Sequence, residues 1–538
     1  MKTVFILGGG VMQLPAVRAA RAKGWRIVVA AREVIPEVAE IADAVEGADL
    51  ADKQAVTAAA LACRDRWGLD GVFTAGTDFS TTASWVAEKL GIPGAPYAAA
   101  LAATDKALMR ETLSRQGVPC PRFVTVETGA KMDPHVLAGF PLVVKPVDNM
   151  GARGVRRVES REELEQALVE AWQVSRSGRA IVEEYLEGPE LSLDALVYGG
   201  CITVCGIADR HICFPPYFVE MGHTMPSGLE EGTLAQAAEI FARGIRALGI
   251  SEGAAKGDVK VTRQGPFIGE IAARLSGGYM SGWTYPLASG VEVTAAALNI
   301  AVGLPPGDLR PRHERCSAER AFISIPGVVA EMTGPSEVRR TAGVEELFLR
   351  AAVGQRVAFP INNLGKCGNV ITCRADREQA IAAAEQAVRR IFIRLEPDRE
   401  ETDRFLFSQS PSPPTPPAFS PHGPGDAEGW RKLPLSSGKA SALARGAEGM
   451  RILTAPLSGY EGARDWHGFG LREALDQVLE RTGVGLEARP QARHLNLGSL
   501  FWRAFLRGSI QGGVYLIDTL FALRDDPRRL EAFLAGRA

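Results

Sequence analysis

The sequence predicts a protein of mixed α/β and α+β fold that is built from several domains. Over about the first hundred residues, short apolar runs alternate with helical segments, which is typical of a parallel sheet covered by helices. Beyond residue 180, strand-like runs separated by loops dominate. A length of 538 residues exceeds what a single hydrophobic core usually organises, so we expect several structural units.

The N-terminal elements follow this pattern in order. Residues 3–7 predict a strand, residues 15–24 a helix that ends at Gly24, and residues 26–31 and 71–76 further strands. The turn at Gly8, Gly9 and Gly10 is part of a dinucleotide-binding fingerprint, but Gln13 occupies the place of its third glycine. We therefore expect a tight strand-to-helix turn there rather than a site for NAD.

Composition excludes several classes of function. With 61 basic and 63 acidic residues the formal net charge is -2, which gives no electrostatic footprint for nucleic acid or an anionic membrane. No apolar run reaches the ~18 residues of a transmembrane helix. The first apolar run fits a strand better than a signal peptide, so we expect a cytoplasmic protein. Eight cysteines do not form a disulfide framework, and Cys201 and Cys205 are expected to be buried free thiols rather than zinc ligands.

Two lysines lie in segments that suit phosphate groups. Lys106 stands near a helix start, and Lys145 lies inside the apolar run LVVKP, where a buried cation is costly unless it meets an anion. The loop after this run can close over phosphates with its backbone amides and a guanidinium. The residues that give the loop this property are Gly151, Arg153 and Gly154. The alternatives are a surface lysine and an ordinary hairpin loop.

Two carboxylates lie on strands that a short turn joins. Asp258 and Glu270 belong to the runs GDVKV and FIGEIAA, and both can point to one face of a sheet. Carboxylate oxygens of this kind suit Mg²⁺ that bridges phosphates. Arg274 follows and can stabilise negative charge that develops on a reacting carboxylate. The alternatives are solvated acids at strand ends and a salt bridge between Arg274 and Glu270.

In their order and spacing these segments resemble the ATP-grasp superfamily, over roughly residues 1–397. The resemblance implies a Rossmann-like N-terminal domain followed by two subdomains that hold ATP between them. It implies that Lys106 and Lys145 contact the phosphates beneath the glycine loop. It also implies that Asp258 and Glu270 bind Mg²⁺ or Mn²⁺.

The same resemblance assigns the segment that begins with VEEYL. Glu183 would open a hinge whose backbone, at Tyr185 and Leu186, reads the edge of the adenine ring. Glu190 would hold the ribose hydroxyls.

One position departs from the commonest pattern of the superfamily. That pattern is Glu-x-Asn, but Ala272 stands where the asparagine would complete the metal site, so the number of metal ions stays open. The run Glu-x-Ala-x-Arg resembles the branch that contains L-amino acid (dipeptide) ligases, and the closing segment also resembles biotin carboxylase. This branch implies that Glu220, a further candidate metal ligand, and His223 line the substrate side. It implies that Arg274 faces the substrate carboxylate.

The expected parts of the chain follow from these segments and from a proline-rich stretch near residue 411. They are a pre-ATP-grasp α/β domain (1–100), a small ATP-grasp subdomain (101–180), a large ATP-grasp subdomain with the metal site (181–310), a closing α+β subdomain (311–400), a Pro-rich linker (408–428) and a small, mainly helical C-terminal unit (429–538). The C-terminal unit is expected to have its own core, and docking of a partner is the alternative.

The function we expect is that of an ATP- and Mg²⁺-dependent ligase that releases ADP and phosphate. A carboxylate becomes an acyl phosphate, an amine attacks it, and Arg274 with the amides near Gly277 and Gly278 stabilises the oxyanion. The partners are therefore small-molecule carboxylate and amine substrates, and the chain is a candidate homodimer. Two alternatives stay open: a bicarbonate-activating carboxylase of the same superfamily, and a regulatory protein that binds ATP without turnover.

Overall fold

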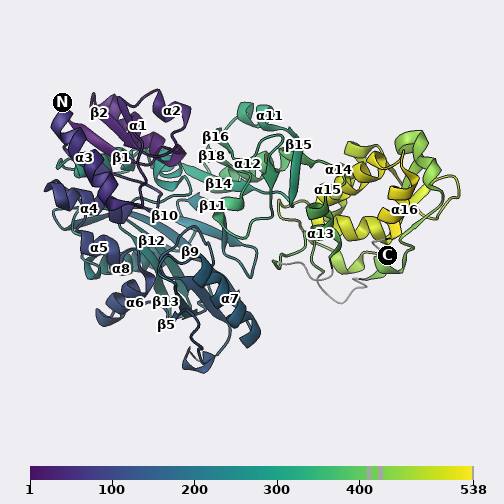
Figure 1. Ribbon diagram of the computed structural model, residues 1–538, viewed down its shortest axis with the longest axis horizontal. Coiled ribbons are helices and arrows are strands. Elements are labelled where there is room, and N and C mark those ends of the chain that lie inside the picture. The colour runs from purple at the N-terminus through teal and green to yellow at the C-terminus, as the bar shows by residue number, and fades with distance from the viewer. Residues whose placement is uncertain (138, 409–412, 422–427, 536–538) are drawn as a thin grey trace. The chain divides into compact units, whose positions relative to one another are not determined.

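The computed structural model describes residues 1–137, 139–408, 413–421 and 428–535 (Figure 1). Contacts among these residues divide the chain into two compact units. The first unit contains Met1–Cys213, Tyr217–Glu319 and Ile371–Ile381, and the second contains Phe214–Pro216, Arg320–Val370 and the described residues of Ala382–Ala538. No helix in the described part of the chain is long and apolar enough to cross a membrane.

The first unit begins with the parallel sheet that the sequence predicts. Its elements are β1 (Thr3–Leu7), α1 (Leu14–Ala22), β2 (Arg26–Ala30), α2 (Pro36–Ala39), β3 (Ala44–Glu46), α3 (Lys53–Trp67), β4 (Gly71–Phe73), α4 (Ser80–Leu90) and α5 (Tyr97–Ala102). The strands lie in the order β3-β2-β1-β4 and every pair is parallel. Gln13 Nε2 donates to the Ala75 carbonyl at 2.7 Å, so the side chain in place of a third glycine ties the turn to the end of β4.

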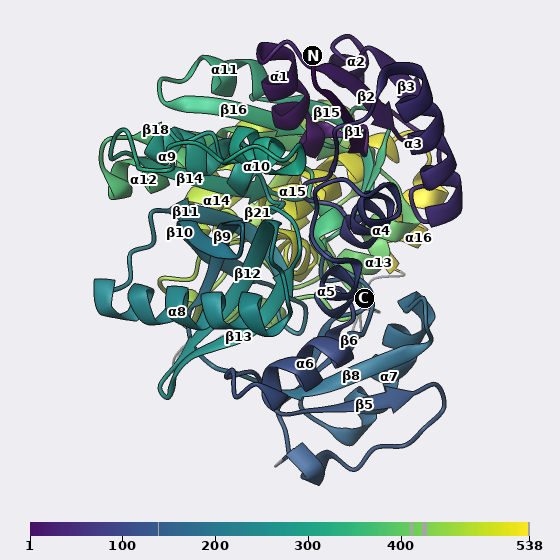
Figure 2. The same cartoon turned by 90° about the vertical axis from the view of Figure 1, so that its left-hand side faces the viewer.

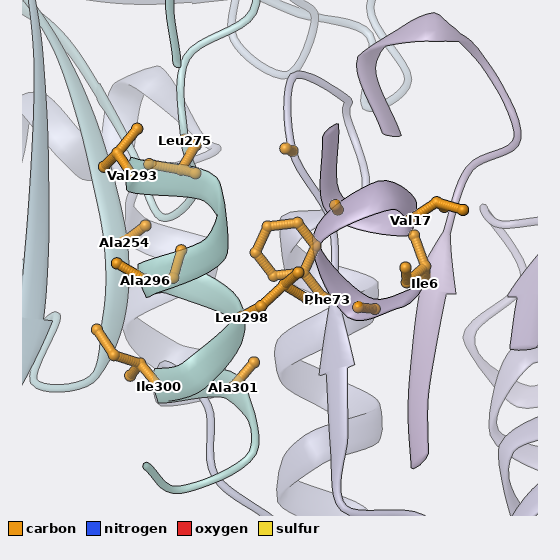
Figure 3. Close-up of a cluster of buried hydrophobic side chains, with 14 of the residues drawn as sticks. Ile6, Val17, Phe73, Ala254, Leu275, Val293, Ala296, Leu298, Ile300 and Ala301 are labelled. Atoms are coloured by element: carbon orange, nitrogen blue, oxygen red, sulfur yellow. The ribbon is translucent and has the colours of Figure 1, made fainter. Parts of the chain in front are cut away.

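Helix α10 (Val293–Ala301) forms part of the core beside this sheet. Figure 3 shows its side chain Leu298 next to Phe73 of β4, with Ile6 and Val17 in the same cluster. Leu298, Ile6 and Val17 are fully buried. Burial of an apolar side chain of this size contributes about 1.5–3 kcal/mol. The cluster therefore ties a helix from residue 293 onward to the N-terminal sheet.

An antiparallel sheet carries one of the predicted lysines. The elements of this part are α6 (Lys106–Arg115), β5 (Phe123–Glu127), β6 (Leu142–Pro146), β7 (Arg156–Val158), α7 (Arg161–Val174) and β8 (Arg179–Glu184). The strands lie in the order β5-β8-β6-β7, and α7 packs against β6, β7 and β8 (Figure 2). Leu142 and Val144 belong to the apolar core of this part. Because side chains alternate along a strand, Lys145 points to the opposite face.

The largest sheet of the first unit has one apolar and one polar face. Its elements here are β9 (Glu190–Tyr198), β10 (Cys201–Cys213), β11 (Val219–Met225), α8 (Glu231–Ala247), β12 (Gly253–Thr262) and β13 (Gly265–Ala272), and the chain continues through α9 (Tyr285–Ser289) and β14 (Cys316–Phe322). Five strands lie in the order β13-β12-β9-β10-β11, all antiparallel. Helix α8 covers one face, where Phe241 and Ile245 pack with Leu193 and Val259 (Figure 2).

The second unit contains residues from both sides of the proline-rich stretch. Its elements include β15 (Gly327–Thr333), α11 (Pro335–Arg340), β16 (Val344–Leu349), β17 (Arg356–Val357), β19 (Phe392–Leu395), α13 (Glu400–Phe407), β20 (Ser436–Ser437), β21 (Met450–Leu453), α14 (Leu471–Thr482), β22 (Gly485–Glu487), β23 (Leu495–Leu497), α15 (Ser499–Ala522) and α16 (Pro527–Ala535). Two further elements, β18 (Gly368–Arg374) and α12 (Arg377–Arg390), have residues in both units. Helix α15 contacts β19 and α13. Arg394 donates to both carboxylate oxygens of Asp518 at 2.6 and 2.7 Å, and the Tyr515 hydroxyl donates to Asp403 at 3.0 Å.

Several expectations meet the structure in these two units. The helix expected around residues 471–482 is confirmed as α14, and it ends at Gly483 with φ 69°. Cys201 and Cys205 are free thiols as expected, but the expected burial of Cys201 is wrong: it begins β10 directly after a Gly-Gly turn and is exposed, whereas Cys205 is half-buried. Within the proline-rich linker, residues 409–412 and 422–427 lie outside the described residues. The six-part domain division stays a prediction.

Candidate active site

Strand register brings charged side chains into one row on the polar face of the large sheet. Glu190 on β9 lies opposite Lys260 on β12 and opposite Arg210 on β10. Arg210 lies in turn opposite His223 on β11. Directly opposed side chains of neighbouring strands are close enough to interact. The row therefore joins two predicted site residues with two cations that the sequence analysis did not select.

The two predicted metal ligands lie directly opposite each other. Asp258 on β12 faces Glu270 on β13 in the antiparallel register. The nearest cation to Glu270 is Lys106, whose Nζ lies 3.8 Å from Oε1, beyond hydrogen-bond distance. Burial alone would raise the pKa of Glu270, but Lys106 and then Lys256 outweigh it and lower the pKa to about 2. Glu270 is therefore an ionised carboxylate at neutral pH.

Asp258 is bonded by three protein groups. Its Oδ1 accepts a hydrogen bond from Ser192 Oγ at 3.0 Å. Its Oδ2 accepts a hydrogen bond from Lys256 Nζ and lies 3.1 Å from Arg210 Nη1. The side chain is almost fully buried. The two opposed acids therefore differ, because Asp258 is bonded to cations and Glu270 is not.

One guanidinium joins three of the predicted functional acids. Arg210 contacts Asp258, donates from Nε to Glu220 Oε2 at 2.9 Å, and donates from Nη1 to Glu190. Burial would lower the pKa of Arg210, but Asp258 first and then Glu190 raise it well above its ordinary value. The residues predicted for ribose, substrate and metal are therefore connected through a single permanent cation.

The predicted phosphate lysine on β6 is paired with a buried acid. Lys145 Nζ lies 2.6 Å from Glu183 Oε2, and Arg110 Nε lies 2.8 Å from Glu183 Oε1. Glu183 and Arg110 are fully buried. Burial would raise the pKa of Glu183, but Arg110 and Lys145 lower it to about 2. The anion that the position of Lys145 requires is thus a protein carboxylate in this structure.

The glycine loop lies over the second predicted lysine. Lys106 Nζ donates to the Asn149 carbonyl at 2.5 Å, and burial lowers the pKa of this lysine. The loop is held from another side by Arg153 Nη2, which donates to Asp78 at 2.7 Å. Both loop glycines adopt positive φ, at 67° in each case: Gly151 and Gly154. The loop predicted to cover phosphates therefore sits beside Lys106, with its backbone shaped by glycine.

Two predicted substrate-side residues, Glu220 and His223, meet at Gly278 of the predicted oxyanion segment. A Cβ atom on Gly278 would lie 2.6 Å from Glu220 Oε1 and 2.8 Å from His223 Cε1, so no larger residue fits without a shift. His223 Nδ1 lies 2.9 Å from Glu319 Oε2, and its Nε2 lies 3.7 Å from Glu220 Oε2. Burial lowers the pKa of His223, but Glu220 and Glu319 outweigh it and raise the pKa. The ring is therefore held between two acids.

Arg274 lies between the glycine loop and the predicted oxyanion segment. Its Nη1 donates to the Leu275 carbonyl at 2.9 Å, and its Nη2 lies 3.9 Å from Met150 Sδ of the loop. A Cβ atom on Gly76 would lie 3.1 Å from Gly277 Cα, so the backbone after Arg274 passes close to the end of the N-terminal sheet. The side chain is buried and bonds to its neighbouring carbonyl rather than forming the alternative salt bridge with Glu270.

The predicted hinge follows directly after β8. The Tyr185 amide donates to the Pro141 carbonyl at 3.3 Å. The Arg157 guanidinium lies 4.5 Å from the centre of the Tyr185 ring, a cation–π contact. Leu186 is half-buried beside it. These contacts order the segment, and its role toward adenine stays a prediction.

Sequence reasoning missed several charged residues of the site. They are Arg110, Asp194, Arg210, Lys256 and Glu319. A local signal existed for two of them. Arg110 lies four residues after Lys106, which places both on one face of a helix, and Lys256 lies two residues before Asp258 on a strand. The other three meet the site only through strand pairing and packing.

Parts of this chain match known protein families and structures. Residues 138–282 match the ATP-grasp domain family, and residues 321–396 match the family L-amino acid ligase C-terminal domain 2. The chain therefore contains an ATP-grasp domain followed by an L-amino acid ligase C-terminal domain. The solved structure of an L-amino acid ligase from Bacillus licheniformis is similar over 74% of this chain and 99% of its own length, with a TM-score of 0.66 and 23% identity. A biotin carboxylase from Campylobacter jejuni is similar over 73% and 92%, with a TM-score of 0.57 and 20% identity. These similarities confirm the predicted ATP-grasp fold.

Curated relatives of this ATP-grasp chain include named ligases and synthases. An uncharacterized protein of Sinorhizobium fredii is 26% identical over 344 residues, 63% of this chain and 71% of the relative. Carnosine synthase 1 of Homo sapiens is 27% identical over 45% of this chain and 32% of its own length. A D-alanine–D-alanine ligase of Ectopseudomonas mendocina is 30% identical over 34% of this chain and 58% of its own length. The match therefore spans about a third of the human synthase and just over half of the ligase, and the relatives with named activities agree with the predicted ligase class.

Proposed function

We propose that this ATP-grasp chain is an ATP- and Mg²⁺-dependent, ADP-forming ligase that joins an amino-acid-type carboxylate to an amine. One observation carries the proposal: Glu270 lies opposite Asp258 and 3.8 Å from Lys106, directly beside the glycine loop that also contacts Arg274. Acids for a divalent cation, lysines for phosphates and an arginine for a carboxylate thus belong to one site.

The nucleotide would lie along Lys106, Lys145 and the glycine loop. Lys106 and Lys145 would bind the phosphates, and the loop amides with Arg153 would cover them. Glu190 would accept hydrogen bonds from the ribose hydroxyls. Its oxygens would be available for this because Arg210 also interacts with two other acids. The backbone that follows Glu183 would meet the adenine.

The acidic residues fit a metal ion that binds together with the nucleotide. Among the residues that the structure describes, no three His, Cys, Asp or Glu side chains converge to hold a metal. Mg²⁺ commonly takes one or two carboxylates and completes its shell with phosphates and water. Glu270 fits that arrangement because its oxygens accept no hydrogen bond from the described residues, and Asp258 opposite it and Glu220 are the further candidates. When bound, Mg²⁺ or Mn²⁺ would neutralise charge on the transferring phosphoryl group.

The chemistry then needs positioning and positive charge rather than a protein nucleophile. The substrate carboxylate oxygen takes the γ-phosphoryl group, which gives ADP and an acyl phosphate. The amine attacks the acyl carbon, and phosphate leaves. Arg274 would bind the carboxylate and then the oxyanion, together with the amides near Gly277 and Gly278. His223, held between Glu220 and Glu319, would line the side of the amine.

The remaining assignments follow from the ligase reading and from the composition. The substrates would be small molecules, and the chain would act in the cytoplasm. Assembly as a homodimer and docking of a partner by residues 429–538 are further predictions.

The experiment that tests the proposal measures ADP and phosphate release from ATP over a panel of amino acids, with mass spectrometry of the products. We expect ATP consumption that depends on an added carboxylate and amine, and a ligated product. AMP as product, or turnover that responds only to bicarbonate and biotin, contradicts the proposal. ATP binding without turnover under any combination supports the regulatory alternative. Arg274→Lys should bind ATP as the wild type does but lose most turnover, because an ammonium cannot reproduce the planar fork.

A further inference from the structure

We propose that Lys256, supported by Arg210, takes the place of a second divalent cation beside Asp258, so that the nucleotide binds with a single metal ion on the Glu270 side. The inference rests on the proposed function, because it concerns the metal that accompanies ATP. It predicts how many metal ions the site holds, a number that the sequence leaves open.

The first observation is that Asp258 has no oxygen free of protein donors. Ser192 donates to Oδ1 at 3.0 Å, while Lys256 and Arg210 contact Oδ2. Asp258 is 4% exposed, and 12% of the Lys256 side chain is accessible. A divalent ion at this carboxylate would have to displace two cations or approach them closely. In a partly buried site such like-charge repulsion is strong.

The second observation concerns the strand opposite. Ala272 on β13 lies directly across from Lys256, two residues from Glu270 and therefore on the same face of the sheet. An alanine side chain offers no oxygen to a metal. The position that could supply a ligand to a second ion is thus apolar, and the residue facing it is a cation.

The third observation is the contrast with Glu270. Within the described part of the chain its carboxylate accepts no hydrogen bond, and its nearest cation, Lys106, lies 3.8 Å away. About a quarter of its side chain is accessible, at 28%. A metal ion can therefore reach Glu270 without breaking a bond, whereas at Asp258 the protein already provides the positive charge.

The test counts metal ions per bound nucleotide. Mn²⁺ would be titrated into the full-length protein saturated with an ATP analogue that has a β,γ-imido bridge, and bound Mn²⁺ would be read by electron paramagnetic resonance. We expect one Mn²⁺ per nucleotide in the wild type. The double variant Lys256→Gln with Ala272→Asn should bind two, because a cation is removed and an oxygen ligand is added.

A matched control separates the position from the loss of a charge. Lys260 lies on the same strand and face but 3.4 Å from Glu190 rather than at Asp258. Lys260→Gln combined with Ala272→Asn should therefore still bind one Mn²⁺ per nucleotide.

Two Mn²⁺ per nucleotide in the wild type would overturn the inference, and so would one Mn²⁺ in the double variant with nucleotide bound. If the double variant loses nucleotide binding, the single variant Lys256→Gln tests the inference instead. In that variant a second Mn²⁺ should bind at least about tenfold more tightly than any second Mn²⁺ binds to the wild type, and an unchanged affinity would overturn the inference. A wild type that binds no nucleotide contradicts the proposed function instead.

Discussion

Two acids of the first unit, Glu183 and Glu270, reach a similar pKa by different contacts. Both have a pKa lowered to about 2 against the opposing effect of burial. Glu183 is bonded at 2.6 and 2.8 Å to Lys145 and Arg110, with 2% of its side chain accessible. Glu270 is surrounded by cations at longer range, and 28% of its side chain is accessible.

This difference distinguishes Glu183, which stabilises the fold, from Glu270, whose carboxylate is available to a ligand. Glu183 compensates the charge of Arg110, which is fully buried and would otherwise be unpaired. Within the described residues the Glu270 oxygens accept no hydrogen bond and are partly accessible, so a metal ion can reach them without breaking a bond. A lowered pKa alone does not distinguish the two, but bond distance and accessibility do.

The largest effect on stability is expected for Glu183→Ala. It leaves Arg110 buried without its partner, so the free energy of unfolding should fall by about 3–5 kcal/mol. Urea unfolding monitored by tryptophan fluorescence measures the change. The control is Glu184→Ala, which breaks the exposed pair with Arg122 and should cost less than about 1 kcal/mol. Equal losses in the two variants would contradict the structural role of Glu183.

The pH dependence of stability gives a second test of the role of Glu183. The pKa of Glu183 is lower in the folded protein than the ordinary 4.5, so its stabilising contribution is present above pH 4.5 and is lost as the pH falls toward about 2. The difference in unfolding free energy between the wild type and Glu183→Gln should therefore shrink over this interval. Unfolding curves at several pH values in that range measure it. A difference that stays constant would mean that folding does not lower the pKa of Glu183.

A smaller effect on stability is expected for Glu270→Gln, with a large effect on activity. The variant loses the charge interaction between Glu270 Oε1 and Lys106 Nζ, which lie 3.8 Å apart and are partly screened by solvent. The free energy of unfolding should therefore change by about 1 kcal/mol. Metal-dependent ATP turnover should fall by about 10²-fold or more, because charge stabilisation at the phosphates is lost. Calorimetric unfolding and an ADP-release assay on the same preparation check both. Full turnover with Mg²⁺ would remove Glu270 from the metal site.

Much of the framework could be predicted from local patterns. The strand–helix alternation of the first hundred residues, the helix that ends at Gly483 and the hairpin of Asp258 and Glu270 all appear in the structure. A strand period of two and a helix period of 3.6 are properties of short segments, so a sequence reveals them. The position of Lys145 in an apolar strand likewise predicts that this lysine has an anionic partner.

The identity of partners was decided only by the tertiary structure. Nothing near Lys145 in the sequence points to Glu183, which reaches it through the pairing of β6 with β8. Arg210 meets Glu190, Glu220 and Asp258 because four strands lie side by side, and a shift of one residue in any of them would turn these side chains to the other face. The exposure of Cys201 likewise follows from its place after a turn. Local residue patterns thus determined which chemistry this protein carries, whereas strand register, a property of the whole sheet, decided which charges neutralise one another and which acid stays open.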